Sequence, residues 1–220
     1  ALTLAKQLAN KKREIYLMNS VNPIRLEGQK TIAFEIYEQL GRVPDIIVMP
    51  IGNAGNIRAL WKGFRELVIL GLTKKLPRVI GVQAKGAAPI VKTLSNGAKN
   101  LIAVKNPETV ATAIRIGAPV NWRYAVEALK SSKGFALSVS DSEILQAQRL
   151  LSSTEGVFVE PASASPLSAL NKLAKEISGK TVVCIATGNG LKDPEAITKN
   201  IKLGTSVKPD LYSLEKALLR

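Results

Sequence analysis

Residues 45–56 read DIIVMPIGNAGN, an apolar run followed by a turn that contains two glycines. The stretch that follows places Ile57, Leu60, Phe64 and Leu67 at helical spacing, so we expect a strand, a tight loop and a helix in that order. Glycine adopts backbone conformations that other residues avoid, and it lets a ligand approach the main chain. The N-terminus of a helix presents free N–H groups and a partial positive charge. The stretch therefore predicts a site for an anion such as a phosphate group.

Apolar runs of this kind alternate with helical patterns along the whole chain. We expect strands over 14–18, 45–51, 78–84, 135–139 and 181–186, and helices over 1–12, 23–40, 56–70, 106–117, 121–131, 140–153, 163–177 and 210–220. Two helix starts carry specific signals, namely Asn22-Pro23 as N-cap and first helical residue, and Ser140 with Glu143 as a capping box.

Continuous apolar strands between helices are typical of a parallel sheet that is covered on both faces. The predicted fold class is therefore α/β, with a mostly parallel sheet and helices on both faces. Ligands of such sheets bind at the carboxyl ends of the strands. Because the glycine-containing turns at 52–56 and 187–190 each follow a strand, we expect them to face one pocket.

Composition excludes several classes of site. The 220 residues are 46% hydrophobic and contain no apolar run of membrane-spanning length, which predicts a globular domain without a membrane partner. No leader segment is visible, and a single cysteine, Cys184, excludes an intrachain disulfide, so we expect a cytoplasmic protein. The chain has no histidine, which excludes Ser-His and Cys-His nucleophile pairs and histidine-ligated metal sites. We predict no metal.

The net charge of +14 is compatible with nucleic acid or with a small anionic substrate. Lysines and arginines are scattered rather than grouped, which is typical of a solvated surface. This favours the small anion, and we predict no nucleic-acid partner.

Five stretches, in this order, resemble one known family: 19–31 (NSVNPIRLEGQKT), 52–56 (GNAGN), 112–117 (TAIRIG), 155–164 (EGVFVEPASA) and 187–194 (TGNGLKDP). The chain resembles threonine synthases, pyridoxal-phosphate enzymes of fold type II with the tryptophan-synthase-β fold. The resemblance implies that O-phospho-L-homoserine and water are converted to L-threonine and phosphate with pyridoxal phosphate as cofactor. It also suggests a homodimer for the full-length protein.

The resemblance implies roles for particular residues. The cofactor phosphate is expected at Gly52, Asn53, Ala54, Gly55 and Asn56, and the pyridine nitrogen at the hydroxyl of Thr187, which can donate to an unprotonated nitrogen. The substrate phosphate is expected at Asn19, Ser20 and Arg25, since a guanidinium fork suits phosphate.

Each assignment has a structural alternative. The turn at 52–56 can serve the fold alone or hold another phosphate ligand, and Thr187 can simply close a strand. Ser20 can cap a helix whose first turn carries a solvated Arg25. Glu160 can orient the cofactor or be a structural carboxylate near a helix N-terminus. Lys85 is expected at the surface.

One departure from the family's pattern decides what this chain does alone. The family's Schiff-base lysine lies in a Ser-Phe-Lys-Asp-like segment upstream of the five stretches, and no lysine here has those neighbours. We therefore expect no catalytic residue in this chain and no activity from it alone. The chain opens at Ala1 without a methionine, so we expect an incomplete fold: residues 1–24 as the remainder of a small N-terminal domain, and 25–220 as the large cofactor-binding domain.

Two other functions fit the same sequence. One is another fold-type-II enzyme, such as a threonine or serine dehydratase, which would not need the phosphate donors at 19–31. The other is a non-catalytic remnant that binds phosphate or cofactor.

Overall fold

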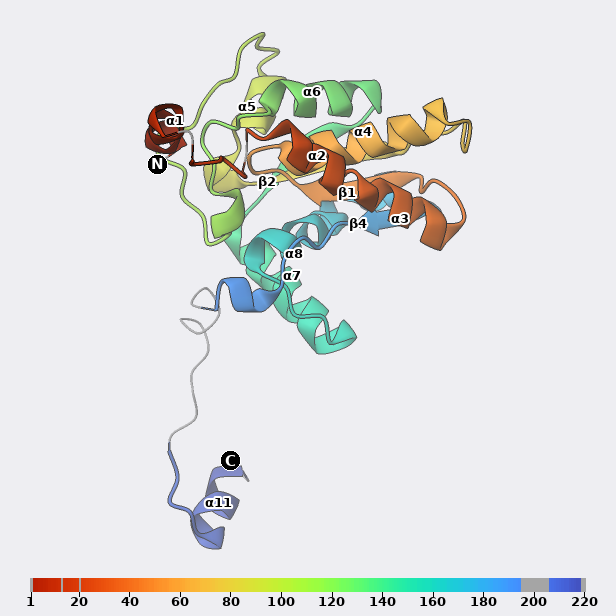
Figure 1. The fold of residues 1–220 in the computed structure, drawn as a ribbon. Helices are drawn as coiled ribbons and strands as arrows, with labels where there is room; N and C mark the ends of the chain where they lie inside the picture. The colour runs from red at the N-terminus through yellow and green to blue at the C-terminus, as the bar shows by residue number, and fades with distance from the viewer. Residues whose placement is uncertain (1, 13, 20, 195–205, 219–220) are drawn as a thin grey trace.

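The computed structural model describes residues 2–12, 14–19, 21–194 and 206–218. Its described part contains a four-stranded sheet in the order β3-β2-β1-β4. The strands are β1 (Ile46–Pro50), β2 (Arg78–Ala84), β3 (Phe135–Val139) and β4 (Val182–Cys184). All neighbouring strands run parallel, with Ile46 opposite both Arg78 and Val182. The predicted α/β class with a parallel sheet is confirmed (Figure 1).

The helices of the described residues are α1 (Leu2–Lys11), α2 (Pro23–Gln29), α3 (Thr31–Leu40), α4 (Gly55–Ile69), α5 (Pro89–Ser95), α6 (Trp122–Ser131), α7 (Asp141–Glu155), α8 (Pro161–Ser168), α9 (Ala174–Ile177) and α11 (Leu211–Leu218). Short 3-10 turns lie at Lys85–Ala87, Thr112–Ile114, Leu170–Leu173 and Gly190–Lys192. None of the described helices is long and apolar enough to cross a membrane.

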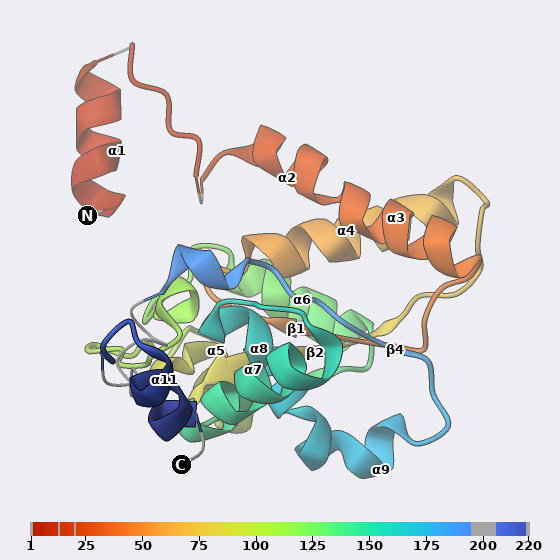
Figure 2. The ribbon, with the colours of Figure 1, turned by 90° about the horizontal axis from the view of Figure 1, so that it is seen from below.

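Helices cover both faces of the sheet because successive side chains of a strand point to opposite faces. Ile47 and Met49 of β1 belong to a core shared with α3, α4 and α6. Their neighbours Ile46 and Val48 belong to a second core shared with α7 and α8. Figure 2 shows α4 and α7 on opposite sides of the strands. Every residue of β1 is buried, which explains why its sequence is a continuous apolar run.

Local signals place two helix starts correctly. The Asn22 side chain accepts a hydrogen bond from Ile24 N at 2.9 Å, and α2 begins at Pro23. At α7, Ser140 Oγ accepts from Glu143 N while the Glu143 carboxylate accepts from Ser140 N, which is the complete capping box.

The predicted strand at 14–18 is wrong. Residues 14–18 form a turn and irregular chain, and the four-stranded sheet does not include them. Ile15, Tyr16 and Met18 are exposed. An apolar run becomes a strand only where another strand satisfies its backbone groups, and no described strand lies beside this run.

The predicted helix at 106–117 is also wrong, because the backbone of this segment bonds to distant chain. Val104 N donates to Gly117 O at 3.0 Å, and Glu108 N donates to Gly86 O at 3.2 Å. A Cβ atom on Gly117 would lie 2.0 Å from Val104 O. These close backbone approaches replace the local bonds of a helix, and only the short 3-10 turn at 112–114 remains.

Two predicted helices are interrupted. The pattern over 23–40 forms α2 and α3, which meet at Lys30, where α4 passes so closely that a Cβ on Gly63 would lie 2.5 Å from Lys30 O. The pattern over 163–177 is divided into α8, a 3-10 turn and α9. Pro166 lies within α8 and has no N–H to donate.

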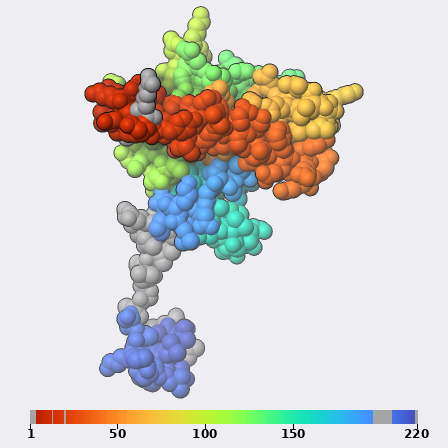
Figure 3. Space-filling view, in the orientation of Figure 1, coloured from red at the N-terminus to blue at the C-terminus, as the bar shows by residue number. Residues whose placement is uncertain are grey.

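The C-terminal helix α11 has no buried residue. Figure 3 shows it apart from the body that the sheet and its covering helices form. The site described next lies entirely within that body.

Candidate active site

A cavity of about 650 Å³ lies at the carboxyl ends of the neighbouring strands β1 and β4. We call it the strand-end cavity. Each of the five stretches singled out in the sequence contributes to its wall. The lining residues include Asn19, Arg25 and Gln29 from the first stretch, 52–56 from the second, Ala113 and Ile114 from the third, Glu160 and Ala162 from the fourth, and Thr187 and Lys192 from the fifth. Segments far apart in sequence therefore meet at one site, at the edge of the sheet where ligands of parallel sheets bind.

The glycine turn, residues 52–56, leads from β1 into α4. Ala54 has φ 64° and ψ 15°, a left-handed conformation that is uncommon for a residue with a Cβ, and α4 begins at Gly55. No side chain among the described residues caps this helix, whereas α7, also 15 residues long, has a complete capping box. The first N–H groups of α4 are therefore available to an anion in the cavity.

Gly52 lets the turn lie against a second segment of the wall. A Cβ atom there would be 3.0 Å from Ala113 O and 3.4 Å from Ile114 Cα, closer than side chains normally approach a backbone. At Gly55 the nearest heavy atoms would be 3.9 Å away. Space at the helix start and uncapped N–H groups together fit a phosphate group.

A hydrogen-bonded support lies behind the glycine turn. Asn121 N donates to Asn53 O at 3.1 Å, and Val120 N donates to Asn53 Oδ1 at 3.4 Å. The Asn121 side chain accepts from Arg58 Nη1 at 2.8 Å. Arg58 lies on α4, so the support joins the turn, the start of α6 and α4. Sequence reasoning assigned Asn121 only to a helix start and missed Arg58, because the contact joins residues 63 positions apart.

Thr187 follows β4, and its exposed side chain lines the same cavity. Its Oγ1 is 2.8 Å from Oγ of Ser163, which is fully buried on α8. Ser163 Oγ also accepts from Gly188 N at 2.7 Å. The sequence did not point to the side chain of Ser163, because serine is common near the start of a helix, where it usually bonds to the local backbone.

Backbone bonds hold the segment around Thr187 against the start of α8. Glu160 N donates to Gly188 O at 3.0 Å, and Gly190 N donates to Phe158 O at 3.1 Å. A Cβ on Gly190 would lie 2.3 Å from the Phe158 ring. The glycines of the TGNG stretch therefore permit this close pairing of two segments.

Glu160 is 3% exposed and lines the cavity. Its Oε1 lies 3.6 Å from Nζ of Lys192, whose side chain is 63% exposed. Among the described residues that line the cavity, the lysine is Lys192. It lies in the Gly-Leu-Lys-Asp-Pro sequence of the fifth stretch. The pair places one negative and one positive charge beside Thr187.

Asn19 and Arg25 both line the cavity, and Arg25 Nη1 donates to Asn19 Oδ1. Arg25 is an exposed residue in the first turn of α2 that also lines the cavity. Ser20 lies outside the described residues. Lys85 is exposed and does not belong to the described wall, as expected of a surface lysine.

The single cysteine, Cys184, is not activated as a nucleophile. Burial raises the pKa of the Cys184 thiol to about 11, so the thiol stays protonated near neutral pH. The structure also shows no group of three or more acidic, cysteine or histidine side chains within the described ranges that would hold a metal ion.

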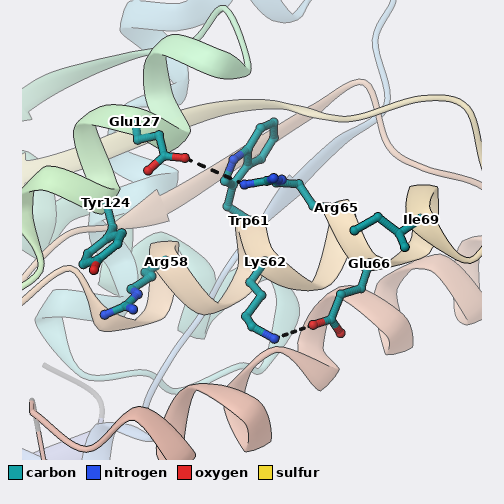
Figure 4. A pocket seen from close by; sticks show the side chains of 8 residues that line it. All are labelled: Arg58, Trp61, Lys62, Arg65, Glu66, Ile69, Tyr124 and Glu127. Atoms are coloured by element: carbon teal, nitrogen blue, oxygen red, sulfur yellow. Dashed lines mark hydrogen bonds and ion pairs between the residues drawn. The ribbon is translucent and has the colours of Figure 1, made fainter.

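A second cavity of about 340 Å³ lies between α4 and α6 (Figure 4). Its charges are already matched within the protein. Arg58 stacks 3.5 Å over the ring of Tyr124, Lys62 pairs with Glu66, and Arg65 lies 3.7 Å from Glu127. Because these cations have partners, the groove offers less to an anion than the uncapped start of α4 does.

Comparison with known proteins identifies the family. Residues 1–188 match the family described as "Pyridoxal-phosphate dependent enzyme". The chain is 52% identical over 222 aligned residues to a threonine synthase of Methanocaldococcus jannaschii and 51% identical over 220 residues to one of Mycobacterium tuberculosis. Each alignment covers 99% of this chain but only 55% and 59% of the relative, so the chain spans little more than half the length of these relatives.

Solved structures with the same fold are more distant in sequence. Maize serine racemase superposes with a TM-score of 0.69 at 20% identity, over 99% of this chain and 58% of the racemase. Threonine deaminase isoform 2 of Solanum lycopersicum gives a TM-score of 0.68 at 20% identity, over 98% of this chain and 55% of the deaminase. At this identity the likeness establishes the fold, and it agrees with the predicted fold type II.

Proposed function

This chain belongs to the family of pyridoxal-phosphate dependent enzymes, and from that premise we propose that it forms the cofactor-binding part of a threonine synthase. The proposed reaction converts O-phospho-L-homoserine and water to L-threonine and phosphate. One observation carries the proposal: the five stretches that resemble threonine synthases line one cavity. The identity of about half to the named threonine synthases supports it.

The residues of the cavity fit pyridoxal phosphate. The glycine turn and the uncapped start of α4 would hold its phosphate, and the Thr187 hydroxyl would donate to its ring nitrogen. When bound, this cofactor serves as an electron sink for the substrate's carbon skeleton. A neutral hydroxyl beside the ring nitrogen would leave the nitrogen unprotonated and so make the ring a weaker electron acceptor. A carboxylate would favour a protonated ring.

A second group of anion-binding side chains in the same cavity fits the substrate phosphate. Arg25 and Asn19 line the wall from the start of α2, with Ser20 as the third proposed donor. Arginine binds phosphate through a planar fork of donors. The net charge of +14 draws doubly anionic substrates towards the molecule. A dehydratase of the same fold acts on substrates without a phosphate and would have no use for this second site.

We propose that these 220 residues alone do not catalyse the reaction, because no lysine in them has the neighbours of the family's Schiff-base lysine. Residues 1–24 then belong to a small domain and 25–220 to the large one. None of the residues with described burial before Leu26 is buried, which supports this division. The complete enzyme is proposed to be a cytoplasmic homodimer.

A chimera tests the proposed reaction. This chain replaces the aligned region of the Methanocaldococcus jannaschii threonine synthase, so that the relative supplies the rest of the protein. We expect phosphate release from O-phospho-L-homoserine with formation of threonine, and a loss of at least tenfold in kcat/KM in R25A. A chimera that binds the cofactor but deaminates threonine or serine instead would identify a dehydratase.

The inactivity of the chain alone is tested by trapping. The chain is mixed with one equivalent of pyridoxal phosphate and reduced with borohydride, and labelled peptides are mapped by mass spectrometry. We expect sparse labelling spread over many lysines. High-yield labelling of one lysine, Lys192 included, would overturn this part of the proposal.

A further inference from the structure

The hydroxyl of Ser163 lies behind Thr187, out of reach of the cavity. Ser163 is fully buried, whereas Thr187 is exposed in the cavity wall, and their oxygens are 2.8 Å apart. Either hydroxyl can be the donor in this pair. The direction matters because it decides whether Thr187 offers a proton or a lone pair to a ligand.

The other hydrogen-bond partner of Ser163 decides the direction of this bond. Ser163 Oγ already accepts from Gly188 N at 2.7 Å. If it also accepted from Thr187, its own proton would need another acceptor in a fully buried position. Among the described residues, Ser163 Oγ has hydrogen bonds only with Gly188 N and Thr187 Oγ1, so no carbonyl oxygen is in place to accept that proton. The carbonyl of Glu160 already accepts from the backbone N–H groups of Ser163 and Ala164.

A buried hydroxyl proton without an acceptor is unfavourable, whereas the proton of exposed Thr187 reaches the cavity. Ser163 therefore donates to Thr187. The Thr187 oxygen then accepts from Ser163, and its proton points to whatever acceptor occupies the cavity.

We propose that Ser163 is a positioning residue that makes Thr187 a hydrogen-bond donor towards the ring nitrogen of the cofactor. This inference rests on the proposed function, because that function puts the ring nitrogen at Thr187. In this series of hydrogen bonds Gly188 N donates to Ser163, Ser163 donates to Thr187, and Thr187 donates to the ring nitrogen. Each donor then has one acceptor. A donor at that place stabilises the unprotonated ring.

The test uses the full 220-residue chain and 4-deoxypyridoxine 5′-phosphate with a ¹⁵N-labelled ring. This probe has no aldehyde, so it binds without reacting with lysines. Two quantities are measured: the dissociation constant, and the pH at which the ¹⁵N shift reports half-protonation of the bound ring. For the unsubstituted chain we expect half-protonation at a lower pH than for the free probe.

S163A removes the donor behind Thr187. We expect its dissociation constant to rise about fivefold, the effect of one lost hydrogen bond, and the half-protonation pH to move back towards the free value by roughly one unit. T187V should give the same ¹⁵N shift, and the double variant S163A/T187V should move it no further, because the two residues act in series.

S165A is the matched control. Ser165 is also fully buried on α8, and its hydroxyl donates to Ala162 O at 2.7 Å, away from Thr187. S165A should leave the half-protonation pH unchanged, although it removes a buried hydroxyl from the same helix. If S163A behaves like S165A, Ser163 has no positioning role and the cofactor site stands. If the probe does not bind the unsubstituted chain, the cofactor site itself is overturned and this inference with it.

Discussion

Nζ of Lys192 lies 3.6 Å from Oε1 of Glu160, and both side chains line the strand-end cavity. The carboxylate is buried, whereas the ammonium is largely exposed. A buried charge depends on its partner more than an exposed charge does, because water compensates only the exposed one. Removing the lysine therefore changes the electrostatics of the cavity more than removing a surface lysine elsewhere.

We expect K192A to weaken the binding of inorganic phosphate and of pyridoxal phosphate about fivefold to tenfold, since it removes a cation and leaves Glu160 uncompensated. Equilibrium titration of each ligand measures the effect. The double variant E160Q/K192A should recover most of the affinity. K175A, which makes the same change of charge at an exposed position on α9, should leave affinity unchanged. Equal losses in K175A and K192A would contradict a local role for the pair.

The capping box of α7 predicts a pH dependence of stability. Hydrogen bonds from Ser140, first from its backbone N–H, and from Lys172 hold the pKa of Glu143 at about 2, below its ordinary value of 4.5. Because the folded pKa is the lower one, this stabilisation is complete above pH 4.5 and disappears as the pH falls towards 2. The side chain is 36% exposed, so solvent screening reduces the contribution.

E143Q keeps a side chain that can complete a capping box and removes the charge. We expect it to lower the free energy of unfolding by about 1 kcal/mol at pH 7 and by much less at pH 3, measured by urea denaturation. E155Q, at the exposed C-terminal end of the same helix, should cause no loss at either pH. A difference for E143Q that is the same at both values of pH would rule out the charge as its cause.

Gly117 predicts a steric effect in the segment between α5 and α6. A Cβ atom there would meet Val104 O at 2.0 Å, a backbone atom that cannot turn away as a side chain can. We expect G117A to lower the free energy of unfolding by about 2 kcal/mol or more. G28A is the matched control, because a Cβ on helical Gly28 meets no heavy atom within 4 Å. It should stabilise the protein by about 0.5–1 kcal/mol, and destabilisation by both variants would refute the steric explanation.

The support behind the glycine turn predicts an indirect effect on phosphate binding. N121A removes the acceptor of Arg58 next to the bond that holds Asn53 O. We expect about a fivefold loss of affinity for pyridoxal phosphate and a loss of stability of about 1 kcal/mol. E127Q breaks the exposed 3.7 Å pair with Arg65 in the neighbouring groove (Figure 4) and should change neither quantity measurably. Unchanged affinity in N121A would show that the turn holds its shape without this support.

Patterns within one segment predicted the elements that depend on that segment alone. Strand β2 was predicted with its observed bounds, and both capped helices begin where Asn22 and Ser140 place them. The wrong predictions share a different cause. The runs at 14–18 and 106–117 have the local patterns of a strand and a helix. Whether such an element forms depends on hydrogen bonds to segments that are distant in the sequence, and here the first run has no strand beside it in the sheet while the second bonds to distant backbone.

The sequence by itself determined the α/β class, the glycine turn before α4 and the order of the five family stretches, because each of these depends on residue spacing along one segment. Only the tertiary structure decided that these stretches share a single cavity, that Glu160 faces Lys192 and that Ser163 lies behind Thr187. Those contacts join residues 24 or more positions apart. They form only where the parallel sheet brings its strand ends together, and no local pattern records which side chains meet there.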